Sequence, residues 1–310
     1  MIANTNIPIL HHYDASPFSN KVRMLMGIKG LDWHSVITPN MMPKPDLVPL
    51  TGGYRRAPVM QVGADIYCDS QLILAEVDRR YPGASISNGM AWASNLWADR
   101  LFFQLTVAII FGQLGDRVDP SFIADREKLS GRPFDVKAMS TAAGPAQGQW
   151  RAQAAWIEEA LSNGDTPFLN GADPGISDLA AHMNIWFLAS VFAVQADILL
   201  DGFSELARWR RALEGFGQGR RKEISGSEAL EIARAHDPEE VDFPHDPANC
   251  EGLAPGSPVV VMADDYGRDP ISGTLVAVSS QRIVIRREVE GLGELNVHFP
   301  RAGFVIKAAG

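Results

Sequence analysis

Ser16 is the first side chain in this sequence whose type and position favour chemistry. It separates a short apolar segment, residues 7–10, from a stretch in which apolar residues recur at helical spacing between Phe18 and Met26. Ser16 is therefore the predicted N-cap of a helix whose first residue is Pro17. The unpaired N–H groups and the positive end of the helix dipole at such a point stabilise a bound anion, and a thiolate is one such anion.

A second helix start that carries a hydroxyl follows a predicted β-hairpin. Segments 57–62 and 66–68 are rich in strand-forming residues, and they flank a turn at residues 63–65. Asp69 and Ser70 then begin the next helix. The sequence thus predicts two helix N-termini near the start of the chain, each with a hydroxyl.

Three motifs occur in an order that resembles the cytosolic glutathione transferases. They are the serine-type segment S-P-F-S-x-K-V-R at residues 16–23, then Arg56-Ala57-Pro58-Val59, and then Asp69-Ser70. The resemblance implies an α+β thioredoxin-like N-terminal domain over residues 1–85 and an all-α C-terminal domain over residues 86–237. It also implies that glutathione is a co-substrate.

Ser16 matches the position at which serine-type members of this family place the hydroxyl that bonds the glutathione sulfur. Lowering the pKa of a thiol by about two units requires ~2.7 kcal/mol, which a hydroxyl donor and a helix N-terminus supply together. Tyr13 is the main alternative, because other branches of the family use a tyrosine near the end of the first strand. Ser19 is interpreted as a first-turn residue, and Ser16 itself would be a good helix cap in any protein. Omega-type members carry cysteine here, so its absence argues against thiol transfer.

The resemblance assigns glutathione binding to five further residues. The third strand of the family opens with a cis-proline, which Pro58 matches, and the backbone of Ala57 would bind the cysteinyl part of glutathione. Ser70 and the adjacent helix N–H groups would hold the γ-glutamyl carboxylate, while Asp69 would pair with the ammonium group. Arg56 would lie near the tripeptide backbone. Plain helix capping by Asp69 and Ser70, and a solvated loop position for Arg56, are the alternatives.

From Ala91 onward the apolar residues follow long helical periods. In the family, the pocket for a small hydrophobic electrophile forms between the first domain and this helical region. The resemblance therefore implies a pocket among Tyr13, Phe18, Trp97, Phe102 and Phe103. An apolar helical stripe is more often core than pocket, and the sequence does not separate the members of this set. Gly175 replaces the Ser or Thr usual before the core helix of the family, at a cost of only a few tenths of a kcal/mol in capping.

The last part of the chain lies outside the resemblance. Prolines and acidic residues over 238–255 predict a linker, and five short β segments over residues 256–310 predict a small SH3-like β-barrel. From Glu251 onward, seven acidic residues against six basic ones argue against a nucleic-acid surface. We expect these residues to form a separate β-domain that contacts protein, either the body of its own chain or a second subunit, because its small core needs a neighbouring surface, and to supply no catalytic group.

Composition limits the classes of protein and of partner that the sequence allows. With 310 residues, 46% of them hydrophobic, the chain buries a large core, and its net charge of −9 disfavours nucleic acid as a partner. The sequence shows no basic leader and no apolar run of ~20 residues, so we expect a cytoplasmic protein without a membrane partner. Cys68 and Cys250 form no disulfide framework, and His11 and His12 point to opposite faces of a strand, so no metal site is expected.

Two functional classes stay open at this point. The leading one is a glutathione transferase that stabilises the glutathione thiolate and conjugates it to a small electrophile, with the homodimer that is common in the family. The alternative is a non-catalytic binding or assembly protein that keeps the fold and acts through its C-terminal β-domain.

Overall fold

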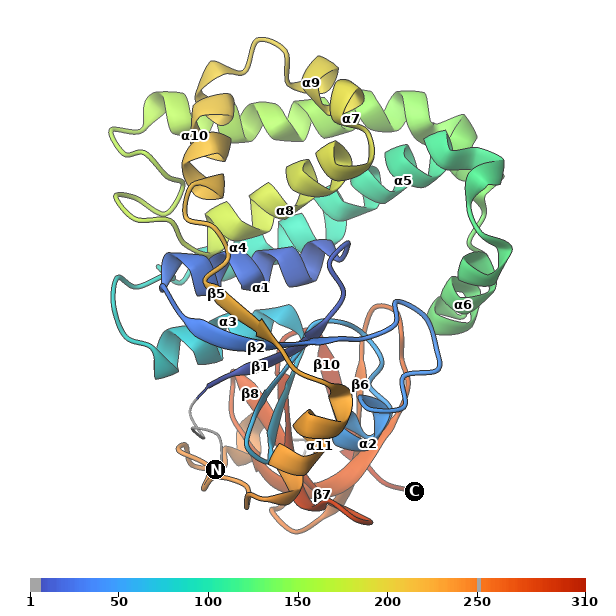
Figure 1. Ribbon diagram of the computed structural model, residues 1–310, viewed down its shortest axis with the longest axis vertical. Helices are drawn as coiled ribbons and strands as arrows, with labels where there is room; N and C mark the ends of the chain where they lie inside the picture. The colour runs from blue at the N-terminus through green and yellow to red at the C-terminus, as the bar shows by residue number, and fades with distance from the viewer. Residues whose placement is uncertain (1–6, 250–251) are drawn as a thin grey trace.

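The computed structural model describes residues 7–249 and 252–310 (Figure 1). The expectations about the start of the chain and about Cys250 lie outside the described residues. Figure 1 shows a layer of helices above a layer of strands, with helix α1 (Pro17–Ile28) between them.

The first part of the chain forms the thioredoxin-like unit that the sequence predicts. Strands β1 and β2 are parallel, β3 is antiparallel to β1, and β4 is antiparallel to β3. After α1 and these strands, helix α3 packs back against α1. The elements are β1 (Ile9–His12), β2 (Asp32–Ile37), α2 (Val48–Thr51), β3 (Val59–Val62), β4 (Asp65–Cys68) and α3 (Ser70–Arg80).

The helical part packs on this unit mainly through contacts of α1 with α8. Its elements are α4 (Ala91–Trp97), the π-helical turn η1 (Ala98–Phe102), α5 (Phe103–Leu114), the 3-10 turn η2 (Gly115–Arg117), α6 (Pro120–Ser130), α7 (Val136–Asn163), α8 (Ile176–Val191), α9 (Ala193–Leu200) and α10 (Ser204–Glu214). Gly175 is the N-cap of α8, and its N–H donates to the buried Asp178 carboxylate at 2.9 Å. Asp178 also accepts the Trp209 indole N–H at 2.7 Å, so this carboxylate stabilises the helix start where glycine cannot.

One segment within residues 86–237 departs from the all-helical pattern that the resemblance implies. Strand β5 (Arg220–Glu223) lies parallel to β2, with Asp32 opposite Arg220, and helix α11 (Gly226–Arg234) follows it. The sequence pattern does not predict this strand, because its four residues are charged and show no apolar alternation. Such a charged strand is suited to the exposed edge of a sheet.

The C-terminal strands extend the thioredoxin-like sheet. They are β6 (Pro258–Ala263), β7 (Ile271–Val278), β8 (Arg282–Val289), β9 (Gly293–Pro300) and β10 (Phe304–Ala308), after a 3-10 turn η3 (Pro247–Asn249). The order β10-β6-β7-β8-β9-β4-β3-β1-β2-β5 makes one ten-stranded sheet. Among residues 7–249 and 252–310 no ladder joins β9 to β10, so the strands are present but the closed SH3-like barrel is not confirmed.

The C-terminal strands join the larger sheet because β4 has a free edge. Residues Asp65–Tyr67 pair in parallel with Asn296–His298 of β9, so each strand satisfies an edge of the other. The apolar side chains of the C-terminal strands share one buried cluster with Val59, Ile66 and Cys68. Five short strands enclose too little volume for a strong core of their own, and this shared core replaces it.

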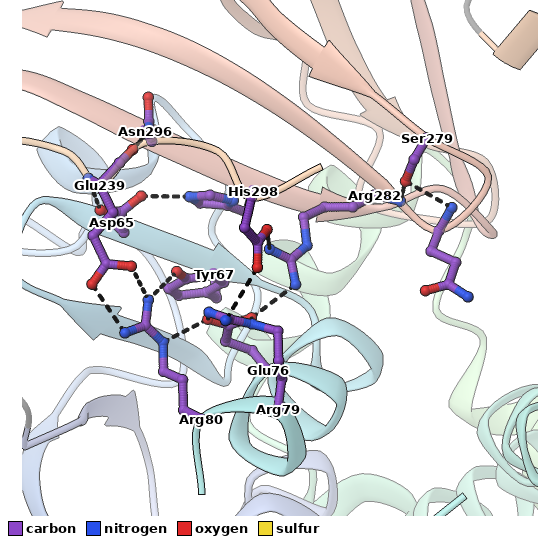
Figure 2. A network of polar contacts seen from close by, with 12 residues as sticks. Asp65, Tyr67, Glu76, Arg79, Arg80, Glu239, Ser279, Arg282, Asn296 and His298 are labelled. Carbon is purple, nitrogen blue, oxygen red and sulfur yellow. Dashed lines mark hydrogen bonds and ion pairs between the residues drawn. The ribbon is translucent and has the colours of Figure 1, made fainter. Parts of the chain in front are cut away.

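A polar network crosses the same junction (Figure 2). His298 of β9 contacts the buried Asp65 carboxylate at 2.7 Å and stacks on Tyr67, with ring centroids 4.4 Å apart. Glu76 of α3 is fully buried and accepts hydrogen bonds from Arg79 (2.6 Å), Arg80 (2.5 Å) and Arg282 of β8 (2.8 Å). This network fixes the position of the C-terminal strands against α3.

Candidate functional site

The strand register brings the three predicted motifs to one end of the sheet. His11 of β1 lies opposite Val59 of β3, and Val59 lies opposite Cys68 of β4. The residues that follow β1, precede β3 and follow β4 are therefore neighbours, and these are the segments of Ser16, Ala57-Pro58 and Asp69-Ser70. Helices α1 and α3 both begin at this end, so two helix N-termini flank the same region.

Ser16 is the N-cap of α1, as the sequence predicts. Its hydroxyl accepts the backbone N–H of Ser19 at 3.2 Å, and the residue is 1% exposed. A hydroxyl accepts and donates at once, so this cap bond leaves a proton for a sulfur or for the Tyr13 oxygen. Burial raises the pKa of Tyr13, and the Ser16 hydroxyl is among the groups that oppose this rise. In the described part of the chain, the buried Ser19 hydroxyl has no hydrogen-bond partner.

The second and third motifs have the backbone geometry that the resemblance implies. The Ala57–Pro58 peptide bond is cis. Asp69 is the N-cap of α3, has a φ of 78°, and accepts the N–H of Gln71 at 3.0 Å. Ser70 is the first residue of α3 and is buried. A positive φ is uncommon for a residue other than glycine, and the cap bond from Gln71 holds the Asp69 carboxylate at the start of α3, beside the free N–H groups of that helix.

The sequence missed a buried ion pair beside this site. The Lys21 ammonium is fully buried and donates to the Asn95 amide at 2.9 Å and to the Asp99 carboxylate at 2.7 Å. Burial raises the pKa of Asp99, and Lys21 opposes that rise. A lysine within the apolar face of a predicted helix was the available signal, because such a side chain needs a buried partner. The pair joins the first turns of α1 to α4 and η1.

The five aromatic residues predicted for an electrophile pocket fall into separate groups. Phe18 and Phe103 meet edge to face between α1 and α5, with centroids 4.8 Å apart, and both are half-buried. Trp97 and Phe102 stack on each other at 5.2 Å and turn toward α7, where Phe102 is fully buried. Tyr13 is half-buried at the end of β1. Phe18 and Phe103 are thus the members that lie between the two parts of the chain.

Arg56 has partners that the sequence did not indicate. Its guanidinium donates to Asp265 at 2.9 Å and lies 4.8 Å from the ring centroid of Tyr266, both in the loop between β6 and β7. The neighbouring Arg55 donates to Asp269 of the same loop at 3.1 Å. These contacts span more than 200 residues, so no local pattern could predict them. The C-terminal strands therefore reach the end of the sheet that carries the predicted site.

A separate cavity of about 360 Å³ lies between α1, α8, α9 and α10. Asn20, His182, Trp186 and Glu214 are among the residues that line it, and the predicted site residues, all within the described ranges, are not. Burial lowers the pKa of His182, and the neighbouring Glu214 opposes that effect. Residues 7–249 and 252–310 contain no cluster of three potential metal ligands and no helix long and apolar enough to span a membrane.

Comparisons with known proteins agree with this geometry. Residues 10–85 match the family model of the glutathione S-transferase N-terminal domain. A GST-like protein from Pseudomonas syringae superposes with a TM-score of 0.78 and 30% identity, over 98% of this chain and 99% of its own. A glutathione S-transferase from Rhodospirillum rubrum (TM-score 0.52, 16% identity) and FzlA from C. crescentus (TM-score 0.51, 19% identity) share the fold over 67% of this chain and 88% of theirs. No curated protein sequence matches the chain.

The Pseudomonas relative matters most, because its similarity extends over almost the whole chain at an identity well above that of the other two. The alignment covers 98% of this chain, so it includes the C-terminal strands. Together with the matched N-terminal domain, this similarity means that the chain belongs to the glutathione S-transferase superfamily.

Proposed function

We propose that this protein is a glutathione transferase that binds glutathione, stabilises its thiolate beside Ser16 and conjugates it to a small hydrophobic electrophile. Glutathione is the co-substrate, and the reaction requires no metal. The observation that carries the proposal is the convergence of Ser16, the cis Ala57–Pro58 bond and the Asp69-Ser70 pair at one end of the sheet.

The two helix N-termini suit different parts of glutathione. The start of α3 offers Ser70 and free N–H groups to the γ-glutamyl carboxylate, and the Asp69 carboxylate suits the ammonium group. The backbone of Ala57 suits the cysteinyl amide, and Arg56 lies next to it. The start of α1 then stabilises negative charge on sulfur through Ser16.

The reaction itself needs little further machinery. Once the thiolate exists at neutral pH it is a strong nucleophile, and holding the electrophile in line converts a bimolecular step into an effectively unimolecular one. Phe18 and Phe103, which meet between α1 and α5, supply an apolar surface near the start of α1. They support a hydrophobic second substrate.

The non-catalytic alternative has one specific observation in its favour. Arg56 already has a carboxylate and a tyrosine from the C-terminal strands as partners. A protein that uses these strands for assembly would keep such contacts permanently. A cytoplasmic homodimer, as the family resemblance implies, belongs to the proposal in either case.

The test compares Ser16→Ala with Tyr13→Phe, each of which removes one hydroxyl. Ultraviolet absorbance of bound glutathione is titrated with pH, and turnover is measured with an aryl halide. We expect Ser16→Ala to raise the pKa of bound glutathione by about one to two units and to lower kcat, with little change in affinity. Tyr13→Phe serves as the control and should change neither.

If Tyr13→Phe raised the pKa of bound glutathione and lowered kcat while Ser16→Ala did not, Tyr13 would be the residue that stabilises the thiolate. Wild-type protein that binds glutathione without forming a thiolate near neutral pH, and without consuming the aryl halide, would favour the non-catalytic alternative.

A further inference from the structure

The loop between β6 and β7 bridges the two parts of the chain that flank the proposed site. Asp265 pairs with Arg56 of the thioredoxin-like unit at 2.9 Å, and Asp264 pairs with Arg100 of η1 at 2.7 Å. The N–H of Gly267 donates to the carbonyl of Leu129 in α6 at 2.9 Å. We call residues Asp264, Asp265 and Tyr266 the acidic clasp.

The acidic clasp lies at the proposed glutathione site. Arg56 directly precedes Ala57, and Arg100 directly follows Asp99, the carboxylate that pairs with Lys21 of α1. Burial raises the pKa of Tyr13, and Tyr266 and Arg126 of α6 are among the charged or ionisable groups near enough to act on it. The clasp and the adjacent Gly267 therefore connect the segment before the cis-proline to η1 and α6 of the helical part.

Arg56 is held by this loop but is not fully satisfied. Its guanidinium faces Tyr266 at 4.8 Å and Tyr54 at 5.7 Å, and one carboxylate oxygen of Asp265 accepts from it. In the described ranges, its Nε is buried without a hydrogen-bond partner. A guanidinium binds a carboxylate best through two parallel N–H···O bonds, and the Asp265 contact uses one. Arg56 could thus gain a bond with a better-placed carboxylate.

The two ion pairs of the clasp differ in their access to water. The side chains of Asp264 and Arg100 are 40% and 41% exposed, so this pair contributes little to stability and salt weakens it further. In the second pair the Asp265 side chain is 32% exposed but Arg56 is only 13% exposed, so breaking this pair requires a replacement carboxylate for Arg56. Glutathione carries two carboxylates of the same chemistry as the aspartates.

We propose that the acidic clasp is a gate of the glutathione site: Asp265 and Asp264 hold Arg56 and Arg100 in a closed state, and Arg56 is released to a ligand carboxylate when the clasp opens. This inference rests on the proposed function. It gives the C-terminal strands a role in ligand access, because the loop that opens is anchored on both sides by β6 and β7.

The test is the rate of glutathione association, followed by stopped-flow tryptophan fluorescence. In the double variant Asp264→Asn/Asp265→Asn the open state is more populated, so we expect the association rate to rise about two- to tenfold. Higher ionic strength should speed association in the wild type and have little effect in the variant. The control is Glu288→Gln/Glu294→Gln, which removes the same two charges from exposed, opposed positions of β8 and β9.

Hydrogen exchange of the Gly267 amide gives a readout without glutathione. Its bond to Leu129 closes the clasp against α6, so exchange should be faster in the clasp variant than in the wild type and the control. Unchanged exchange, or an association rate that stays the same or falls, would overturn the gate. Wild-type protein that fails to bind glutathione would instead refute the proposed function.

Discussion

Glu76→Gln tests how the C-terminal strands are fixed to the thioredoxin-like unit. Burial by itself would raise the pKa of Glu76, but the hydrogen bond from Arg79 and the charges of Arg282 and Arg80 outweigh it and lower the pKa from 4.5 to about 2. A shift of this size corresponds to about 3 kcal/mol of stability at neutral pH. Glutamine keeps the shape of the side chain but turns an N–H₂ group toward guanidinium donors.

The direction of the pKa shift of Glu76 determines how the stability depends on pH. The folded-state pKa is depressed, so the stabilisation is fully present above pH 4.5 and is lost as the pH falls toward 2. We expect Glu76→Gln to lower the free energy of unfolding by about 3 kcal/mol at pH 7, and we expect the difference from wild type to shrink below pH 4.5.

The assay is urea unfolding between pH 3 and pH 7, followed by circular dichroism and by tryptophan fluorescence. Coincident transitions by the two probes are required before a free energy is extracted, because a chain of this size often unfolds through intermediates. Glu205→Gln is the control, since Glu205 pairs with Arg208 at 2.8 Å and both side chains are largely accessible to water, at 37% and 42% exposure. The control should change stability by less than about 0.5 kcal/mol. An equally small effect of Glu76→Gln, or a difference from wild type that does not change with pH, would refute the reasoning.

Two further changes test the ligand site and the shared core. Ser70→Ala should weaken glutathione binding by about 1–3 kcal/mol in calorimetry, because a buried carboxylate of the ligand loses a donor, and unchanged affinity would remove Ser70 from the site. A chain that ends at Asp237 should aggregate or remain unfolded by circular dichroism and light scattering, because β4 loses β9 and the cluster around Ile66 and Cys68 is opened; a folded, monodisperse product would show that the C-terminal strands are dispensable for folding.

Local rules predicted the parts of the site that are local in sequence. Ser16 is a cap because a small polar residue precedes proline at a helix start, and Asp69 caps α3 for a similar reason. The cis bond at Pro58 came from the family resemblance and not from spacing. The two helix caps require only a few neighbouring residues, so one sequence is enough to predict them.

The parts that the sequence did not predict depend on contacts between distant segments. The sequence predicted that the C-terminal β-domain contacts protein, either the body of its own chain or a second subunit, but it did not indicate the surface. In the structure β9 pairs with the edge of β4, and whether two strand edges match depends on the three-dimensional arrangement of both. The charged strand β5 was missed because periodicity identifies only strands that bury an apolar face.

The charge balance of the C-terminal strands also has a different meaning in the folded protein. From the sequence, their acidic residues argued only against a nucleic-acid surface. In the structure, Asp264, Asp265 and Asp269 pair with Arg100, Arg56 and Arg55. The acidic residues are thus complements of basic groups around the proposed site, placed there by the extension of the sheet through β9. The sheet extension through β9 and the ion pairs of Glu76 both fix the position of the C-terminal strands. We therefore expect Glu76→Gln to weaken the contacts of the acidic clasp as well, and faster hydrogen exchange of the Gly267 amide would show this.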